Sequence, residues 1–255
     1  ILIGRGELEQ AARHFKQQYV LGHQRATALY NLACAKARAG NADGALDVLD
    51  LAVRHGFEDT SLVRSDSDLA AIRDRAELAE LVHDMQTIAD LRAELAGLKA
   101  SGNPELLYGL HSELAHLLTA DGKLLERHGH MALKAGDHGE AAWAFEQQAE
   151  VGHRPADGYY NVACARALAG DVERGLALLA RAADEGMAYS PIREDRDLDA
   201  LRDDPRFAEL ERRIALRGEE RVALKTSLAG GDGHVALEEL DRIRTDAGRS
   251  ADERA

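Results

Sequence analysis

Small and apolar residues recur along the chain with the spacing of α-helices. Residues 26–39 are rich in alanine, and Gly40-Asn41 follows them. Glycine suits the left-handed position just past a helix, and asparagine caps the start of the next helix. The following segment has one apolar stripe at helical spacing, formed by Ala45, Leu46, Leu49 and Ala52. The pattern predicts a helical hairpin that turns at Gly40-Asn41.

The same pattern returns 130 residues later. A shift of 130 aligns Phe15-x-Gln17-Gln18 with Phe145-x-Gln147-Gln148, Gly22-His23 with Gly152-His153, and Tyr30-Asn31-Leu32-Ala33-Cys34-Ala35 with Tyr160-Asn161-Val162-Ala163-Cys164-Ala165. A deletion of one residue then brings Asp68-Leu69 onto Asp197-Leu198. We interpret the chain as an internal duplication. Because hairpins of about 34 residues cannot bury both faces alone, we expect them to stack into a solenoid.

Composition strengthens the prediction of an all-α fold. Hydrophobic residues make up 45% of the 255 residues, but only 4% are aromatic and only four are proline. Good helix formers dominate, so a large sheet is not expected. The net charge of 32 − 45 = −13 argues against broad nucleic-acid binding, because proteins that bind phosphates concentrate lysine and arginine. No segment approaches the roughly 20 apolar residues of a membrane helix, so no membrane insertion is predicted.

The beginning of the chain and its cysteines bear on its origin. Ile1-Leu2-Ile3-Gly4 is neither an initiator methionine nor a signal peptide, which suggests part of a larger bacterial protein. Two cysteines cannot build a disulfide framework. The compartment stays open, with the cytoplasm favoured over the periplasm.

The spacing of small and apolar residues resembles that of tetratricopeptide repeats (TPRs). It is carried by Gly40, Ala45, Leu49 and Ala52, and by Ala33 and Gly129, which stand where this family needs a small residue between paired helices. The sequence departs from the family at the closing proline, where it has His23, Phe57, His153 and Met187. The resemblance implies a helical-repeat fold and a function in protein–protein interaction.

The end of each copy resembles the segment that closes many bacterial TPR arrays, the TPR end-of-group domain. The matching residues are Gly56-Phe57, Asp68-Leu69 and Arg73 in the first copy, and Gly186-Met187, Asp197-Leu198 and Arg202 to Phe207 in the second. Asp204-Pro205 predicts a helix start, with aspartate as N-cap and proline at the first position. Further helices are expected at 84–100, 104–118, 208–227 and 234–245.

These observations predict four parts. They are residues 1–82 as the first TPR-like copy, 83–121 as a helical connector, 122–215 as the second copy, and 216–255 as C-terminal helices with a frayed tail. Residues 64–75 and 193–206 mix acidic and basic side chains, which a partner patch or an ion-paired surface would explain.

Several residues have spacings that also occur in metal sites. Glu113-x-x-His116 and Glu150-x-x-His153 have the spacing of carboxylate–histidine pairs in di-iron bundles, but those sites need two further glutamates. His128 and His130 diverge around a helix. Asp232 to Glu239 resembles half of an EF-hand loop, but Leu228 and Gly230 stand where that loop has its first carboxylates. No metal site and no cofactor is predicted.

No catalytic group of residues is evident either. Cys34 and Cys164 lie among alanines without a neighbouring cation or base, so we interpret them as small buried hydrophobic residues. Gly230-Gly231-Asp232-Gly233 lacks the lysine of a phosphate-binding loop. The chain is predicted not to be an enzyme. The alternative is a metal-dependent enzyme or regulator with a histidine-based site, or a solenoid that self-assembles.

The resemblance also implies where a protein or peptide partner would bind. If the first helix of each hairpin faces a groove as in the family, the lining consists of Thr27, Tyr30, Asn31, Cys34 and Arg38 in the first copy and Asp157, Tyr160, Asn161, Cys164 and Leu168 in the second. Asparagine can hold an extended backbone, and tyrosine is a frequent hot-spot residue. The competing interpretation is that the Tyr-Asn pairs only lock adjacent helices.

Overall fold

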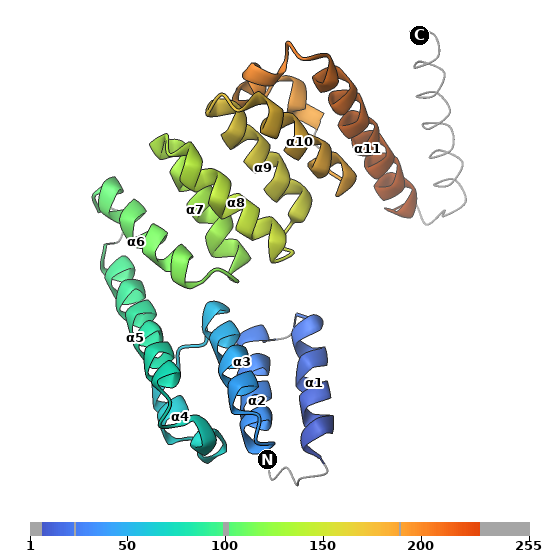
Figure 1. Ribbon diagram of the computed structural model, residues 1–255. Helices are drawn as coiled ribbons and strands as arrows, with labels where there is room; N and C mark the ends of the chain where they lie inside the picture. The colour runs from blue at the N-terminus through green and yellow to red at the C-terminus, as the bar shows by residue number, and fades with distance from the viewer. Residues whose placement is uncertain (1–6, 23, 99–101, 189, 230–255) are drawn as a thin grey trace. The chain divides into compact units, whose positions relative to one another are not determined.

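A computed structural model describes residues 7–22, 24–98, 102–188 and 190–229, and every regular element in these ranges is a helix (Figure 1). The chain divides into two compact units, one ending at His128 and the other beginning at Gly129. The all-α class predicted from composition and periodicity is confirmed. None of the described helices is both long and apolar enough to cross a membrane.

Unit 1 is built from successive helices that pack on their neighbours. Its elements are α1 (Leu8–Val20), α2 (Arg25–Arg38), α3 (Ala42–Arg54), α4 (Thr60–Ser65), the 3₁₀ helix η1 (Ser67–Ile72), α5 (Ala76–Gly97), α6 (Pro104–Leu117) and the first half of α7 (Gly122–Ala135). α2 packs between α1 and α3, and η1 lies against α2. α5 packs against α3, α4 and α6.

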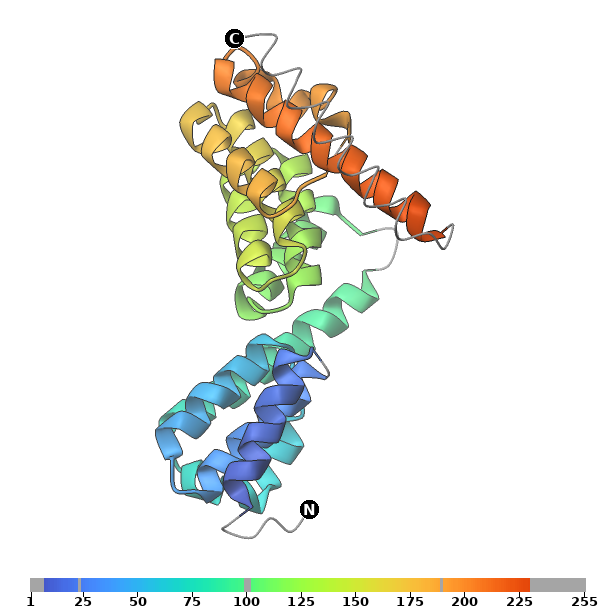
Figure 2. The ribbon, with the colours of Figure 1, turned by 90° about the vertical axis from the view of Figure 1, so that its right-hand side faces the viewer.

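Unit 2 repeats this order of elements. It contains the second half of α7, then α8 (His138–Glu150), α9 (Pro155–Leu168), α10 (Val172–Asp184), the 3₁₀ helices η2 (Ser190–Arg193) and η3 (Arg196–Leu201), and α11 (Pro205–Ala229). α9 packs between α8 and α10, and η3 lies against α9. The long helix α11 (orange to red) runs beside α10 in both views (Figures 1 and 2).

The predicted turn glycines have left-handed backbones, and the residues after them cap the next helix. Gly40 has a φ of +82°, and the side chain of Asn41 accepts a hydrogen bond from the Gly44 N–H at 3.0 Å. In unit 2, Gly170 has a φ of +78°, and Asp171 caps α10 by accepting from the Arg174 N–H at 3.3 Å. The helical hairpins α2–α3 and α9–α10 therefore turn where the sequence indicates.

Small side chains are completely buried within the helical hairpins. Ala33 on α2 and Ala163 on α9 are both completely buried. A Cβ atom built on Gly129 would lie 2.6 Å from Cε1 of Phe145 and 2.7 Å from its Cζ. This position thus accepts only glycine without a shift of the buried ring, because real Cβ contacts are not this short.

α5 begins earlier than the sequence indicated, and α11 begins where Asp204-Pro205 predicted a helix start. α5 begins at Ala76 rather than at 84, because Leu78, Leu81 and Val82 continue its buried face. α11 begins at Pro205, and the side chain of the predicted cap Asp204 accepts from the Arg206 N–H at 2.9 Å. It continues without a break through the segment expected at 208–227. The predicted part boundaries at 82/83 and 215/216 therefore fall inside continuous helices. The helix expected at 234–245, residues 230–239 of the candidate loops and the frayed tail lie outside the described residues, while Leu228 and Ala229 belong to α11.

Candidate interaction surfaces

A tyrosine on the first helix of each hairpin is hydrogen-bonded to an aspartate of the following 3₁₀ segment. The Tyr30 hydroxyl donates to Oδ2 of Asp66 at 2.5 Å. The other oxygen of Asp66 accepts from the backbone N–H of Asp68 at 2.9 Å, which starts η1. Arg73 completes the group by donating from Nη2 to the Asp66 carbonyl oxygen at 2.6 Å. We call Tyr30, Asp66 and Arg73 the clasp of unit 1, because they hold η1 against α2.

Unit 2 contains a clasp of the same residue types. Tyr160 donates to Oδ2 of Asp195 at 2.6 Å, and Arg202 donates to the Asp195 carbonyl oxygen at 2.7 Å. Asp195 also accepts from the Asp197 N–H at 3.0 Å and so starts η3. Each clasp joins segments that are 35 or 36 residues apart in the chain.

The protonation of the unit 1 clasp follows from burial and hydrogen bonding. Burial alone would raise the pKa of Asp66, but hydrogen bonds from Tyr30 and from the Asp68 N–H lower it overall. Burial, together with the hydrogen bond to Asp66, raises the pKa of Tyr30 far above its usual value. At neutral pH the pair is thus a neutral phenol donating to a carboxylate, which is a charge-assisted hydrogen bond.

Both cysteines lie beside the clasps as buried thiols. The Cys34 thiol donates to Oδ2 of Asp66 at 3.7 Å, and burial above all raises its pKa to about 12. Burial likewise raises the pKa of Cys164, and the charges of Asp195 and Asp197 raise it further. A thiolate is the reactive form of cysteine. Both side chains therefore behave as the small buried residues that the sequence indicated.

The ten residues predicted to line a groove are not equally accessible. Tyr30, Cys34, Tyr160 and Cys164 are buried, Asn31, Asp157 and Asn161 are half-buried, and Thr27, Arg38 and Leu168 are exposed. The structure brings the tyrosine and cysteine of each copy together around one aspartate. Their polar atoms are directed into the unit, as the helix-locking interpretation requires. Binding of a partner by the exposed and half-buried residues stays a prediction.

Sequence reasoning missed the two aspartates at the centre of the clasps. Asp66 and Asp195 stand two residues before the aligned pairs Asp68-Leu69 and Asp197-Leu198, so the alignment already placed them together. Their partners Tyr30 and Tyr160 were singled out for another role. An identical aspartate in both copies at the start of a 3₁₀ segment was the available signal.

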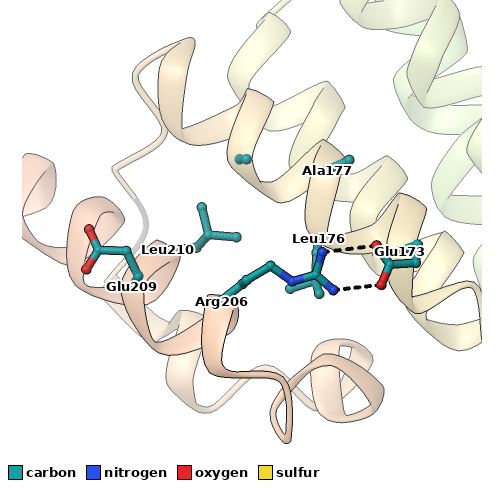
Figure 3. Close-up of a pocket in the computed structure, with 7 residues that line it drawn as sticks. Glu173, Leu176, Ala177, Arg206, Glu209 and Leu210 are labelled. Carbon is teal, nitrogen blue, oxygen red and sulfur yellow. Dashed lines mark hydrogen bonds and ion pairs between the residues drawn. The ribbon is translucent and has the colours of Figure 1, made fainter.

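A groove with a volume of about 370 Å³ lies between α10 and α11 in unit 2 (Figure 3). It is lined by Glu173, Leu176, Ala177, Ala180, Arg206, Glu209 and Leu210. The leucine and alanine side chains form an apolar floor, and the charged side chains stand at the rim. Ala177 and Ala180 are small, so a ligand in the groove can approach the backbone of α10.

Arg206 joins the two walls of this groove at one end. Its guanidinium donates to both carboxylate oxygens of Glu173, at 3.0 and 2.7 Å (Figure 3). It also pairs with Asp204 at 2.7 Å and holds the pKa of that carboxyl down at about 2. Glu173 and Arg206 are exposed and Asp204 is partly exposed, so these ion pairs contribute little to the stability of the fold.

The corresponding surface of unit 1 is charged where the groove of unit 2 is apolar. At the positions 130 residues before Ala177 and Ala180, α3 carries Asp47 and Asp50. Asp47 is exposed, and Asp50 pairs with Arg54 at 2.7 Å. The apolar character of the groove is thus a property of unit 2.

One histidine of unit 1 stacks on a tyrosine. The Tyr108 and His128 rings stack with their centroids 5.5 Å apart, and His128 is completely buried. Burial lowers the pKa of the neighbouring His111, and the charges of Arg127 and His128 lower it further. Among the described residues, no three His, Cys, Asp or Glu side chains are placed to hold one metal ion.

Comparison with known proteins adds no family assignment. No protein-family model matches the chain, and no curated protein matches it significantly.

Proposed function

We propose that the chain is a non-catalytic protein–protein interaction module, a duplicated TPR-like solenoid that holds a segment of a partner protein. Support for the TPR-like part comes from the Gly-Asn and Gly-Asp turns, the buried small residues, and the two clasps of matching residues about 130 positions apart. The observation that carries the binding function is the groove between α10 and α11.

The groove has the chemistry of a peptide-binding surface. Ala177 is exposed and Ala180 is half-buried, so they offer apolar area and allow a partner backbone or helix to come close. Leu176 and Leu210 line the groove but are almost fully buried. A volume of about 370 Å³ holds a few anchoring side chains rather than a whole domain. Interfaces of this kind obtain most of their affinity from such anchors, while a charged rim contributes orientation and specificity.

A swap between equivalent helices tests this proposal. The double variant Ala177→Asp/Ala180→Asp gives α10 the residues that α3 has at Asp47 and Asp50. Because α3 tolerates these residues in the same kind of helix, the variant should remain folded, while two carboxylates on the groove floor should repel an apolar anchor. The matched control, Asp47→Ala/Asp50→Ala, removes charge from α3 and leaves the groove unchanged.

The measurement is affinity purification from extracts of the source organism, with quantitative mass spectrometry. Candidates enriched by the unaltered chain are then purified and titrated directly. We expect a partner whose affinity falls at least tenfold with the α10 variant and stays within twofold with the α3 variant. Equal affinities for both variants, with unchanged circular dichroism, would exclude the groove as the binding site.

The predicted faces of α2 and α9 are tested in the same assay. Asn31→Ala and Asn161→Ala remove half-buried amides without touching the clasps. Loss of the partner with helicity retained would assign these asparagines to binding. Loss of folding would assign them to the scaffold.

A further inference from the structure

His111 of α6 has an environment that favours the neutral imidazole over the imidazolium. The residue is half-buried, and its Nδ1 atom is buried and has no hydrogen-bond partner in the described part of the chain. A neutral imidazole can carry its proton on Nε2 and leave Nδ1 as an unprotonated acceptor. The imidazolium carries a proton on both nitrogens, so Nδ1 would become a buried donor without an acceptor, which is costly.

The charges that act on His111 also oppose its protonation. Burial is the largest cause that lowers the pKa of His111, and the charges of Arg127 and His128, both on α7, lower it further. α5 packs against α6 as well, but the groups that shift this pKa include no side chain of α5 and no carboxylate of the described residues. A proton on His111 therefore adds a second positive charge near Arg127 without a compensating negative one.

This charge would arise beside the ring pair that joins α6 to α7. His128 is completely buried, and its ring stacks on that of Tyr108 with centroids 5.5 Å apart and planes 20° apart. Tyr108 and His111 are three residues apart, so they lie on the same face of α6. The contact between the two helices thus contains two imidazoles and a guanidinium in a partly buried place.

We propose that the contact between α6 and α7 is a proton-sensitive switch, closed near neutral pH and opened by mild acidification when His111 takes up a proton. Opening moves the new charge away from Arg127 and exposes Nδ1 to water. The division between the two units falls within α7, so the switch acts on the helix that connects them along the chain. This regulation goes beyond the proposed function and does not depend on the groove between α10 and α11.

The direction of the pH effect follows from proton binding to the two states. In the open state His111 has its ordinary pKa of 6.5, and in the closed state its pKa is lower. Because the open state binds the proton more readily, the closed state loses stability as the pH falls below 6.5, until the closed-state pKa is reached. At pH 5.0 this single proton can shift the opening equilibrium by about 30-fold at most.

The test is hydrogen exchange of the full chain at pH 7.5 and 5.0, followed by mass spectrometry and corrected for the intrinsic pH dependence of exchange. We expect the protection of the α6 amides to fall by about five- to 30-fold, while that of the α9 amides changes less than twofold. His111→Gln cannot gain a proton, so it should keep the change in α6 below twofold. The matched control is His83→Gln, which removes an exposed histidine of α5 and should retain the full loss.

Arg127→Gln is a second variant that should remain folded, because Arg127 is exposed. It removes the neighbouring cation, so the titration midpoint of His111 followed by NMR should rise toward 6.5, and the loss of α6 protection should shrink. α6 protection that stays within twofold in the unaltered chain, or an equal loss in the His111→Gln and His83→Gln chains, would overturn the inference. An equal loss in α6 and α9 would also overturn it, since it would show general unfolding rather than a local opening.

Discussion

Gly129→Ala tests how α7 packs against Phe145 of α8. The added methyl group raises the helix propensity of α7 but collides with the ring of Phe145. In a helix interior, alanine is more favourable than glycine by about 0.5–1 kcal/mol. At Gly129 the added methyl group would meet three ring atoms of Phe145 at 2.6, 2.7 and 2.8 Å. Since Phe145 is completely buried, its ring has little room to move away.

The collision should outweigh the gain in helix propensity. Overpacking a well-filled core costs about 1–3 kcal/mol. We therefore expect Gly129→Ala to lower the free energy of unfolding of unit 2 by roughly 1–2 kcal/mol, taking overpacking and propensity together. For about 100 residues this corresponds to a fall in Tm of roughly 5–15 °C.

The assay and its control both use unit 2. Trp143 is the only tryptophan of the chain and lies on α8, so its fluorescence during urea unfolding reports on this region. Gly218 lies inside α11, and a Cβ built on it meets nothing within 4 Å. Gly218→Ala should therefore stabilise by up to about 1 kcal/mol.

A double variant identifies the cause. Phe145→Leu removes the ring that the alanine would meet, so Gly129→Ala should cost less in that background, with a coupling of about 1 kcal/mol. If Gly129→Ala stabilised the chain as much as Gly218→Ala does, the packing of α7 on α8 described here would be wrong.

Three further predictions concern burial and the clasps. Ala33→Leu should overpack the α2–α3 hairpin by about 1–3 kcal/mol and lower the Tm measured by circular dichroism. Tyr160→Phe removes the hydrogen bond to Asp195 and should cost about 1.5–3 kcal/mol in urea unfolding, since the acceptor is charged. The folded-state pKa of Asp66 is lowered, so its contribution is present above about pH 4 and is lost as the pH falls through the folded value. Unfolding curves from pH 5 to 2 should show this loss, and Asp66→Asn should flatten it.

Local features of the fold could be predicted from sequence, because they depend on nearby residues. The turn at Gly40-Asn41 needs only a left-handed glycine and a capping side chain, and both signals are adjacent in the chain. The start of α5 was missed because Arg75 offers no side-chain cap, so nothing local marks the boundary. There, the buried leucines after Arg75 decide where the helix begins.

The surfaces were harder to predict, because they depend on residues far apart in sequence. Tyr30 reads as a groove residue by analogy, but its hydroxyl is taken by Asp66, 36 positions away. The groove depends on two alanines of α10 facing Leu210 of α11, and alanine gives no periodic signal that separates a binding surface from a helix surface. Only the packing of the two helices makes these positions concave.

Exposed ion groups of similar composition lie at the start of α5 and of α11. In unit 1, Arg75 pairs with Glu77 at 2.8 Å and with Asp43 of α3 at 3.2 Å. In unit 2 the arginine stands two positions later, at Arg206, and the carboxylate two positions earlier, at Asp204, so the order along the chain is reversed. Each arginine bridges a neighbouring carboxylate and a carboxylate on an earlier helix, Asp43 of α3 or Glu173 of α10. Charge arrangement at the start of α5 and α11, rather than residue identity, is therefore the common feature. An alignment that compares single positions pairs Arg75 with Asp204 and Glu77 with Arg206, and so misses this similarity.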